Sequence, residues 1–249
     1  MTGPRKRRVV KLEESRILKR KDITPDIWLI WIEKPEGYAF KPGQYCTIGV
    51  DGIERAYSIV SAPYEDSLEL FIELVPKDDG GVLTPELYKL NPGDKVSIRP
   101  RAKGIFTFNP DFTNHLLVST VTGVVPYVSY LRDYINDGRN DHKFYFLMGA
   151  SYHDEFSYDS ELRQMESEHP GMITFVPTIS RPSEERNKNW EGDTGRVNTI
   201  VEKYIETFKL TSSDTLIYAC GHPGMIEDVK ARMTPKGWTV QEERFWKED

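Results

Sequence analysis

Two short patterns in the first half of the chain combine residues that bind phosphates and flat rings. Residues 55–58 (Arg-Ala-Tyr-Ser) offer a forked guanidinium suited to a pyrophosphate, and Tyr57 projects to the same face of an expected strand as Arg55. Residues 80–84 (Gly-Gly-Val-Leu-Thr) open a short expected helix, where backbone N–H groups favour an anion. An edge strand and a capped glycine turn are the plainer interpretations of these two patterns. The occurrence of both patterns in the same half of the chain nevertheless favours a phosphate site.

Two further patterns in the second half each follow an expected strand and precede a helix. Residues 119–127 (Ser-Thr-Val-Thr-Gly-Val-Val-Pro-Tyr) suit a pyrophosphate, although they form neither a G-x-G-x-x-G nor a Walker fingerprint. Residues 220–225 (Cys-Gly-His-Pro-Gly-Met) allow three interpretations of Cys220: a nucleophile assisted by His222, a thiol placed against a cofactor, or a small buried hydrophobe. Residues two apart do not converge on one point without a sharp turn, so the second interpretation fits better than the first.

The end of the chain and the metal-binding residue types complete the candidates. Residues 242–249 place Phe245 and Trp246 side by side near a charged end, so these rings either plug the core or lie on a flat ligand. The five histidines show no metal-ligand spacing. The two cysteines, Cys46 and Cys220, are too few for a disulfide framework, an iron–sulfur cluster or a four-cysteine zinc site. No metal site is expected.

The secondary-structure elements that must position these residues follow a different order in each half of the chain. The first half has short β-rich segments separated by Pro, Gly, Asn and Asp turns, which predicts an antiparallel six-stranded β-barrel. Its helical interruption, residues 84–90, is expected to have Thr84 as N-cap and Pro85 at its first position. The six expected strands are residues 9–17, 27–32, 44–50, 56–61, 68–74 and 95–100.

After residue 108 buried strands alternate with amphipathic helices, which predicts an α/β doubly wound parallel sheet. Such sheets bind ligands at the carboxyl ends of their strands. The length of 249 residues suits two domains, expected at 1–108 and 109–249. The expected strands of the second are 116–119, 143–149, 173–178, 215–219 and 239–243, and its helices are 126–136, 159–168, 197–208 and 224–233.

The charge is unevenly distributed along the chain. The net charge is −6, but residues 1–21 carry nine Lys and Arg against Glu13 and Glu14, a net of +7. This basic arm is either a solvated tail or a binding element for nucleic acid, an acidic protein or an anionic ligand. No secretory signal or membrane-length apolar run is visible, so a soluble, cytoplasmic protein in a reducing setting is expected.

Taken in order, the patterns resemble the ferredoxin–NADP reductase family over about residues 9–246. Arg-x-Tyr-Ser is followed by Gly-x-x-Thr, Thr-Gly-x-x-Pro, Ser180-Arg181 and Cys-Gly-x-Pro-x-Met. Residues 68–94 and the aromatic tail 243–246 look like the bacterial subclass that acts on flavodoxin or ferredoxin. The resemblance implies FAD as cofactor and NADP(H) as substrate.

The resemblance also implies which residues hold the flavin. Arg55 would bind the FAD pyrophosphate, Tyr57 would lie against the isoalloxazine, and Ser58 would lie near its N5. Phe245 would shield the flavin face that the nicotinamide enters, and Trp246 would stack on the adenine. The implied FAD residues are Arg55, Ala56, Tyr57, Ser58, Phe71, Ile72, Gly81, Val82, Leu83, Thr84, Phe245 and Trp246.

On the nucleotide side, the resemblance implies that Cys220 and Glu243 lie at the hydride-transfer point, which with Ser58 and Phe245 makes the catalytic set. Two departures from the family pattern stand out. Val121 occupies a position where the family often has glycine, and residues 149–151 lack the Arg that many bacterial members place there. The implied NADP residues are Thr122 and Gly123 at the domain cleft, and Ser180, Arg181 and Arg196 on the 2′-phosphate.

The expected function is electron exchange through FAD between NADP(H), which transfers a hydride, and ferredoxin or flavodoxin, which transfer single electrons. Two alternatives remain: the NAD(P)H-dependent reductase component of an oxygenase system, and a non-catalytic flavin-binding module. A monomer with no nucleic-acid or membrane partner is expected. Because ferredoxin and flavodoxin are usually acidic, such a carrier is a candidate partner of the basic arm.

Overall fold

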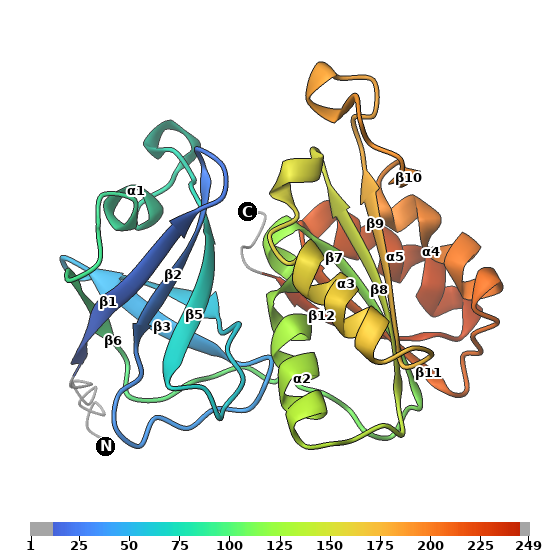
Figure 1. The fold of residues 1–249 in the computed structure, drawn as a ribbon, viewed down its shortest axis with the longest axis horizontal. Coiled ribbons are helices and arrows are strands. Elements are labelled where there is room, and N and C mark those ends of the chain that lie inside the picture. Colours follow the sequence, from blue (N-terminus) through green and yellow to red (C-terminus); the bar gives the residue numbers. More distant parts are fainter. Residues whose placement is uncertain (1–11, 245–249) are drawn as a thin grey trace, which may run out of the picture.

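The computed structural model describes residues 12–244 and contains two six-stranded sheets (Figure 1). The first sheet has the order β4-β3-β6-β1-β2-β5 and is antiparallel throughout, as predicted. It curves into a near-barrel whose outer strands approach each other at one seam. Its strands are β1 (Glu13–Asp22), β2 (Ile27–Glu33), β3 (Tyr45–Val50), β4 (Ile53–Ser58), β5 (Ser67–Glu73) and β6 (Lys95–Ile98).

Backbone and side-chain hydrogen bonds join the chain just after β4 to β5 and so close this seam. Val60 N donates to Glu69 O at 2.9 Å, and Glu69 N donates to the Ser61 hydroxyl at 2.7 Å. Alternate residues of the strands point inward and form an apolar core that includes Trp28, Ile30 and Ile48. The barrel therefore has its own core.

The first strand corrects the interpretation of the basic arm. β1 was expected at residues 9–17 but runs from Glu13 to Asp22, so the second half of the arm is a strand of the barrel rather than a tail. Arg20 is built into this structure, because its Nη1 donates to Tyr88 O at 2.6 Å and Leu90 O at 2.8 Å. Residues 1–11 lie outside the described part of the chain.

The short helix of the barrel begins at Thr84, one residue before the expected first helical position at Pro85, and ends at Leu87 rather than at residue 90. α1 spans Thr84–Leu87, and its N-cap position is Leu83, so Thr84 is not the N-cap. The Thr84 hydroxyl instead accepts from Val75 N at 3.0 Å and donates to Val75 O at 3.1 Å. Thr84 therefore ties the helix start to the preceding loop, in which a short 3₁₀ turn, η1 (Lys77–Asp79), was not predicted.

The second sheet has the order β10-β9-β8-β7-β11-β12 and is parallel throughout, which confirms the doubly wound prediction. Its strands are β7 (Asn114–Thr120), β8 (Lys143–Ala150), β9 (Ile173–Ile179), β10 (Asp193–Thr194), β11 (Thr215–Gly221) and β12 (Thr239–Arg244). The two-residue strand β10 was not predicted, because it is too short to show alternation.

Helices cover both faces of the parallel sheet. One apolar cluster packs α2 and α3 on one face, and a second packs α4 and α5 on the other. The helices are α2 (Val125–Asn136), α3 (Asp159–Glu168), α4 (Val197–Thr207) and α5 (Pro223–Met233), and the short turns are η2 (Val121–Val124), η3 (His153–Glu155), η4 (Glu185–Asn187) and η5 (Thr234–Lys236). Within residues 12–244 no helix has the length and apolar character needed to cross a membrane.

Helix α2 lies between the two sheets (Figure 1). The apolar cluster on its side of the parallel sheet also contains Val60 and Phe71 from the barrel half. Buried hydrogen bonds cross between the halves; among them, the Ser129 hydroxyl donates to Ser61 O at 2.8 Å, and the Tyr130 hydroxyl donates to Phe106 O at 2.6 Å. The two halves therefore share a packed interface.

Candidate functional site

The strand order of the parallel sheet reverses between β7 and β11. The chain leaves β7 toward β8 on one side and leaves β11 toward β12 on the other. Helix α2, which follows β7, covers one face, and α5, which follows β11, covers the opposite face. A crevice at the carboxyl ends of these two strands is where doubly wound sheets bind their ligands.

The turns after β7 and β11 approach each other so closely that two glycines are required. A Cβ on Gly123 would lie 2.1 Å from Cys220 O, and a Cβ on Gly221 would lie 2.3 Å from the Thr120 hydroxyl oxygen. The same hydroxyl accepts from His222 N at 2.8 Å. The structure therefore brings together the two patterns that the sequence placed 100 residues apart.

Val121 holds the first of these turns in a left-handed conformation, with a φ of 36°. The family resemblance predicts glycine at this position. A β-branched residue in this region is strained by roughly 1–2 kcal/mol. The turn keeps a glycine-type backbone path without the glycine, because the contacts of Gly123 and Thr120 with the end of β11 hold it.

Gly221→Ala is expected to lower the free energy of unfolding by about 2–4 kcal/mol, because alanine combines an unfavourable φ of 124° with overlap on Thr120. Gly52→Ala is the matched control: Gly52 also has a positive φ, 82°, but a Cβ there meets no atom within 4 Å. Urea denaturation of both variants measures the difference. Equal losses would mean that the close approach of the two turns contributes nothing.

Three side chains lie in one row across adjacent strands at this edge. Cys220 is paired in register with Ser119 on β7 and with Glu243 on β12. Cys220 is fully buried, and burial, with a smaller contribution from Glu243, raises the pKa of its thiol well above the usual value. The thiol is therefore protonated at neutral pH. Because the His222 ring accepts from Gly224 N at 3.0 Å, the structure does not support the nucleophile interpretation of Cys220.

Glu243 is the unusual member of this row. Burial raises the pKa of its carboxyl from 4.5 to about 7. Its Oε2 is buried and has no hydrogen-bond partner among the described residues. A buried acid that titrates near neutral pH and has an unpartnered oxygen is suited to take up or release a proton.

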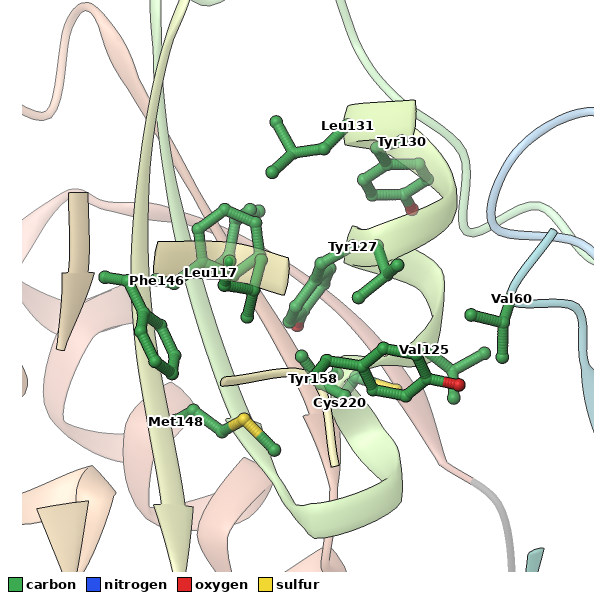
Figure 2. Close-up of a cluster of buried hydrophobic side chains, with 14 of the residues drawn as sticks. Val60, Leu117, Val125, Tyr127, Tyr130, Leu131, Phe146, Met148, Tyr158 and Cys220 are labelled. Atoms are coloured by element: carbon green, nitrogen blue, oxygen red, sulfur yellow. The ribbon is translucent and has the colours of Figure 1, made fainter. Parts of the chain in front are cut away.

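The barrel contributes the end of β4 to the same region. Val60, two residues beyond Ser58, lies with Cys220, Tyr127 and Tyr158 in the buried cluster shown in Figure 2. The chain that carries residues 55–58 therefore leads directly to the row containing Cys220. This arrangement brings the first and fourth sequence patterns to one interface.

Within β4, Arg55 and Tyr57 share one face, as predicted, because they stand opposite Ile48 and Cys46, two residues apart on β3. Tyr57 packs against the barrel core, and burial raises the pKa of its hydroxyl. Arg55 is exposed and donates to Glu54 O at 2.8 Å. A half-buried ring beside an exposed guanidinium remains available for a flat ligand carrying phosphate.

Phe71 and Ile72, expected to lie together on the flavin, point to opposite faces of β5. Phe71 lies in the interface, edge-on to the Tyr158 ring with centroids 5.6 Å apart. Ile72 is packed inside the barrel core. Only the backbone of Ile72 can therefore contribute to a site at the interface.

The glycine-rich loop, residues 80–84, was expected to offer its backbone N–H groups to an anion, and the structure differs from this in detail. Gly80 N donates to Lys77 O at 3.1 Å and Gly81 N donates to Pro76 O at 2.9 Å, so both glycine N–H groups are used within the loop. Val82 is exposed, whereas Leu83 is buried. An anion bound at this loop would therefore contact residues 82–84 rather than the two glycines.

The residues expected on a 2′-phosphate lie along one edge of the parallel sheet. Ser180 N donates to Ala150 O at 2.9 Å, which places Ser180 and Arg181 beside the end of β8. Gly195 N donates to Ile179 O at 2.8 Å, which places Arg196 beside the end of β9. Arg181 and Arg196 are both exposed at this edge.

Three neighbouring residues at this edge, Tyr152, Arg186 and Asn187, were not among the predicted site residues. The guanidinium of Arg186 lies 4.1 Å from the centre of the Tyr152 ring, and Asn187 is buried. They belong to different loops, and no spacing in the sequence signals their contact.

Phe245 and Trp246, the aromatic residues expected at the flavin, lie outside the described residues. Among residues 12–244, no group of three or more His, Cys, Asp or Glu is placed to hold a metal ion.

An antiparallel near-barrel packed on a doubly wound sheet, with a thiol and a carboxyl buried at the switch point, defines a two-domain nucleotide-dependent oxidoreductase. Residues 117–231 match the family described as the oxidoreductase NAD-binding domain. The chain belongs to the ferredoxin/flavodoxin–NADP reductase family.

Individual relatives are similar over most of the chain. The ferredoxin–NADP reductase of Pseudomonas aeruginosa is 30% identical over 82% of this chain and 82% of its own length. The flavodoxin/ferredoxin–NADP reductase of Buchnera aphidicola is 26% identical over 93% of this chain and 98% of its own. The crystal structure of a ferredoxin–NADP⁺ reductase from Neisseria gonorrhoeae, with bound FAD and NADP, superposes with a TM-score of 0.82 at 26% identity and covers 95% of this chain and 99% of that one.

Proposed function

We propose that this protein binds FAD and exchanges electrons between NADP(H) and a one-electron carrier, ferredoxin or flavodoxin. The observation that carries the proposal is the pairing of Cys220 with Glu243 at the switch point, against the barrel half that bears the Arg-x-Tyr-Ser strand. When bound, the flavin supplies the ability to accept a hydride and to release electrons singly. The protein supplies binding, orientation and a proton.

The barrel residues suit FAD by their position. Arg55 would hold the pyrophosphate, Tyr57 would lie against the isoalloxazine, and Ser58, buried at the end of β4, would lie beside its reactive edge. The backbone of residues 82–84 at the start of α1 would contact the pyrophosphate. Phe71 would support the ring from the interface side, because it already packs on Tyr158.

The parallel-sheet residues suit the nicotinamide nucleotide. Thr122 and Gly123 lie on the turn between β7 and α2, at the edge where doubly wound sheets bind their ligands. Cys220 is a small side chain that is fully buried at this edge. Glu243, whose pKa burial raises to about 7, would take up or release a proton at the hydride-transfer point.

Spectroscopic titration tests the proposal directly. The purified protein is expected to show a flavin absorption spectrum that bleaches on addition of NADPH, and to reduce ferricyanide catalytically. Steady-state rates with purified ferredoxin and flavodoxin would then identify the carrier. A protein that binds flavin but is not reduced by NADPH would be a binding module, and a protein reduced by NADPH that transfers electrons to neither carrier would favour the oxygenase-reductase alternative.

Two exposed lysines of β1 provide a test of the carrier. A β-bulge lies between Ile17 and Lys19, after which Lys19 and Lys21 share one face and are both exposed. Because an acidic carrier would be steered by positive charge, Lys19→Glu/Lys21→Glu is expected to lower kcat/KM for ferredoxin about tenfold at low salt and to weaken its dependence on ionic strength.

The control for this variant is Lys143→Glu/Lys209→Glu, which makes the same charge change on exposed residues of the parallel-sheet half. Its salt dependence is expected to match the unaltered protein. If both double variants behave alike, only the overall charge matters and β1 does not form part of the carrier surface.

A further inference from the structure

A tyrosine ring at the carboxyl edge of the parallel sheet lies against two guanidinium groups. Tyr152 follows β8, and its hydroxyl accepts from Arg181 Nη1 at 2.8 Å. The guanidinium carbons of Arg186 and Arg181 lie 4.1 and 5.3 Å from the centre of the Tyr152 ring. The two cations are therefore held around one aromatic ring, although Arg186 and Tyr152 belong to separate loops.

A buried asparagine fixes this arrangement. Asn187 is 2% exposed, and its side-chain amide donates to Ser151 O and to Arg181 O, both at 2.9 Å. Its side-chain oxygen accepts from His153 N at 3.0 Å. Because a single side chain joins the backbone of both loops, the residues that flank Arg186 are positioned before any ligand arrives.

This pair of loops lies where the phosphate end of a nucleotide is expected. Ser180 N donates a hydrogen bond to Ala150 O, so Tyr152 lies just beyond the end of β8 and Arg181 just beyond the end of the neighbouring strand β9. Arg196 follows Gly195, whose N–H donates to Ile179 O at the end of β9. Residues 149–151 contain no cation, so Arg186 brings to this edge a charge that the chain after β8 does not provide.

The acidic neighbours of these arginines do not block an anion. Arg186 forms a two-point pair with Asp154, from Nε to Oδ2 at 2.9 Å and from Nη2 to Oδ1 at 2.7 Å, and Arg181 Nη1 lies 3.6 Å from Glu184. All four side chains are 39–53% exposed, so solvent screens both pairs. A phosphomonoester dianion, which offers two charges and matches the guanidinium fork, can replace these partners.

We infer that Arg186 is a specificity-determining residue that, together with Arg181 and the Tyr152 ring, binds the 2′-phosphate of NADP(H). The inference rests on the proposed function, because it concerns the nucleotide end of the same site. Arg186 thereby separates NADP(H) from NAD(H), which lacks that phosphate. Arg181 and Arg196 are then not the only cations responsible for this preference.

Binding of adenosine 2′,5′-bisphosphate and of 5′-AMP to the full-length protein, measured by titration calorimetry, tests the inference. Arg186→Ala is expected to weaken binding of the bisphosphate about tenfold and to leave binding of AMP unchanged. Arg186→Lys, which keeps the charge but loses the fork and the stacking, is expected to fall between the two. In kinetics, kcat/KM for NADPH falls by a similar factor while that for NADH stays the same.

Arg163→Ala is the matched control, because Arg163 is also exposed in the parallel-sheet half and lies over an aromatic ring, 5.5 Å from the centre of Phe175. If Arg186→Ala and Arg186→Lys lower the melting temperature but keep the preference for the bisphosphate, the arginine only stabilises the loops and the inference is wrong. If the unaltered protein shows no preference for the bisphosphate over AMP, both the inference and the NADP(H) part of the proposed function are wrong.

Discussion

Replacing Glu243 by Gln is expected to slow NADPH-dependent ferricyanide reduction about a hundredfold, within the range that a positioned acid or base contributes. The change keeps the size and polarity of the side chain but removes its proton. Glu243 is half-buried in register with Cys220, and the pKa of its carboxyl is raised to about 7. The unaltered protein is expected to lose activity as the pH rises through 7, whereas the variant should show no such transition. Stopped-flow rates between pH 5.5 and 9 measure both.

The same substitution makes an independent prediction about stability. A carboxyl with a pKa of about 7 in the folded protein and 4.5 when unfolded takes up a proton on folding. Its favourable contribution is complete below pH 4.5 and is lost as the pH rises to 7, a change of roughly 3 kcal/mol. Glu243→Gln should therefore match the unaltered protein near pH 4.5 and be more stable at pH 8.

Melting temperatures across this pH range check the prediction, and Glu191→Gln, at an exposed acid of the same half, is the control with no expected change. A slower variant that is also more stable at pH 8 would show that the protein retains a destabilising acid for its activity. If Glu243→Gln shows neither effect, Glu243 is not the proton-carrying group of this site.

Local patterns were sufficient to predict most of the architecture. The helix at residues 159–168 was placed at its observed bounds, and the change from alternating strands to strand–helix units marked the transition between the two sheets. These features depend on neighbouring residues along the chain. The displacement of β1, which starts four residues and ends five residues later than expected, has a different cause: its basic residues show no alternation, and its register is set by pairing with β2 and β6.

The candidate site could be predicted in part for the same reason. Cys220 and Gly123 stand out because a strand end, a glycine and a helix start follow each other in sequence, and the structure places them in contact. Contacts between loops carry no such signal, so the Arg186–Tyr152 pair was missed. The opposite directions of Phe71 and Ile72 follow from the two-residue period of a strand, and the family resemblance alone did not distinguish them.

A further interaction that local patterns could not reveal is centred on Arg132 of α2. Its Nε and Nη2 donate to the two carboxylate oxygens of Glu161 at 2.7 and 2.9 Å, and its Nη1 donates to Glu69 at 2.7 Å and to Glu65 at 3.3 Å. The other Glu69 oxygen accepts from the Tyr158 hydroxyl at 2.8 Å. One guanidinium thus joins strand β5 of the barrel to helices α2 and α3 of the parallel-sheet half.

Arg132→Met is expected to lower the free energy of unfolding by about 3–5 kcal/mol at pH 7, because methionine leaves Glu69, which is 3% exposed, without its cation and beside two further carboxylates. Urea denaturation at pH 7 measures the loss.

Two further variants separate the buried network from an ordinary ion pair. Lys203→Met removes a cation that is 56% exposed and pairs with Asp193 at 3.0 Å, so a loss of at most about 1 kcal/mol is expected. Adding Glu69→Gln to Arg132→Met should recover part of the lost stability, because the amide carries no charge into the interface. A loss from Arg132→Met as small as that from Lys203→Met would show that apolar packing alone joins the two halves. Recovery in the double variant would instead show that the unpaired charge of Glu69, rather than the missing arginine side chain, is what destabilises the interface.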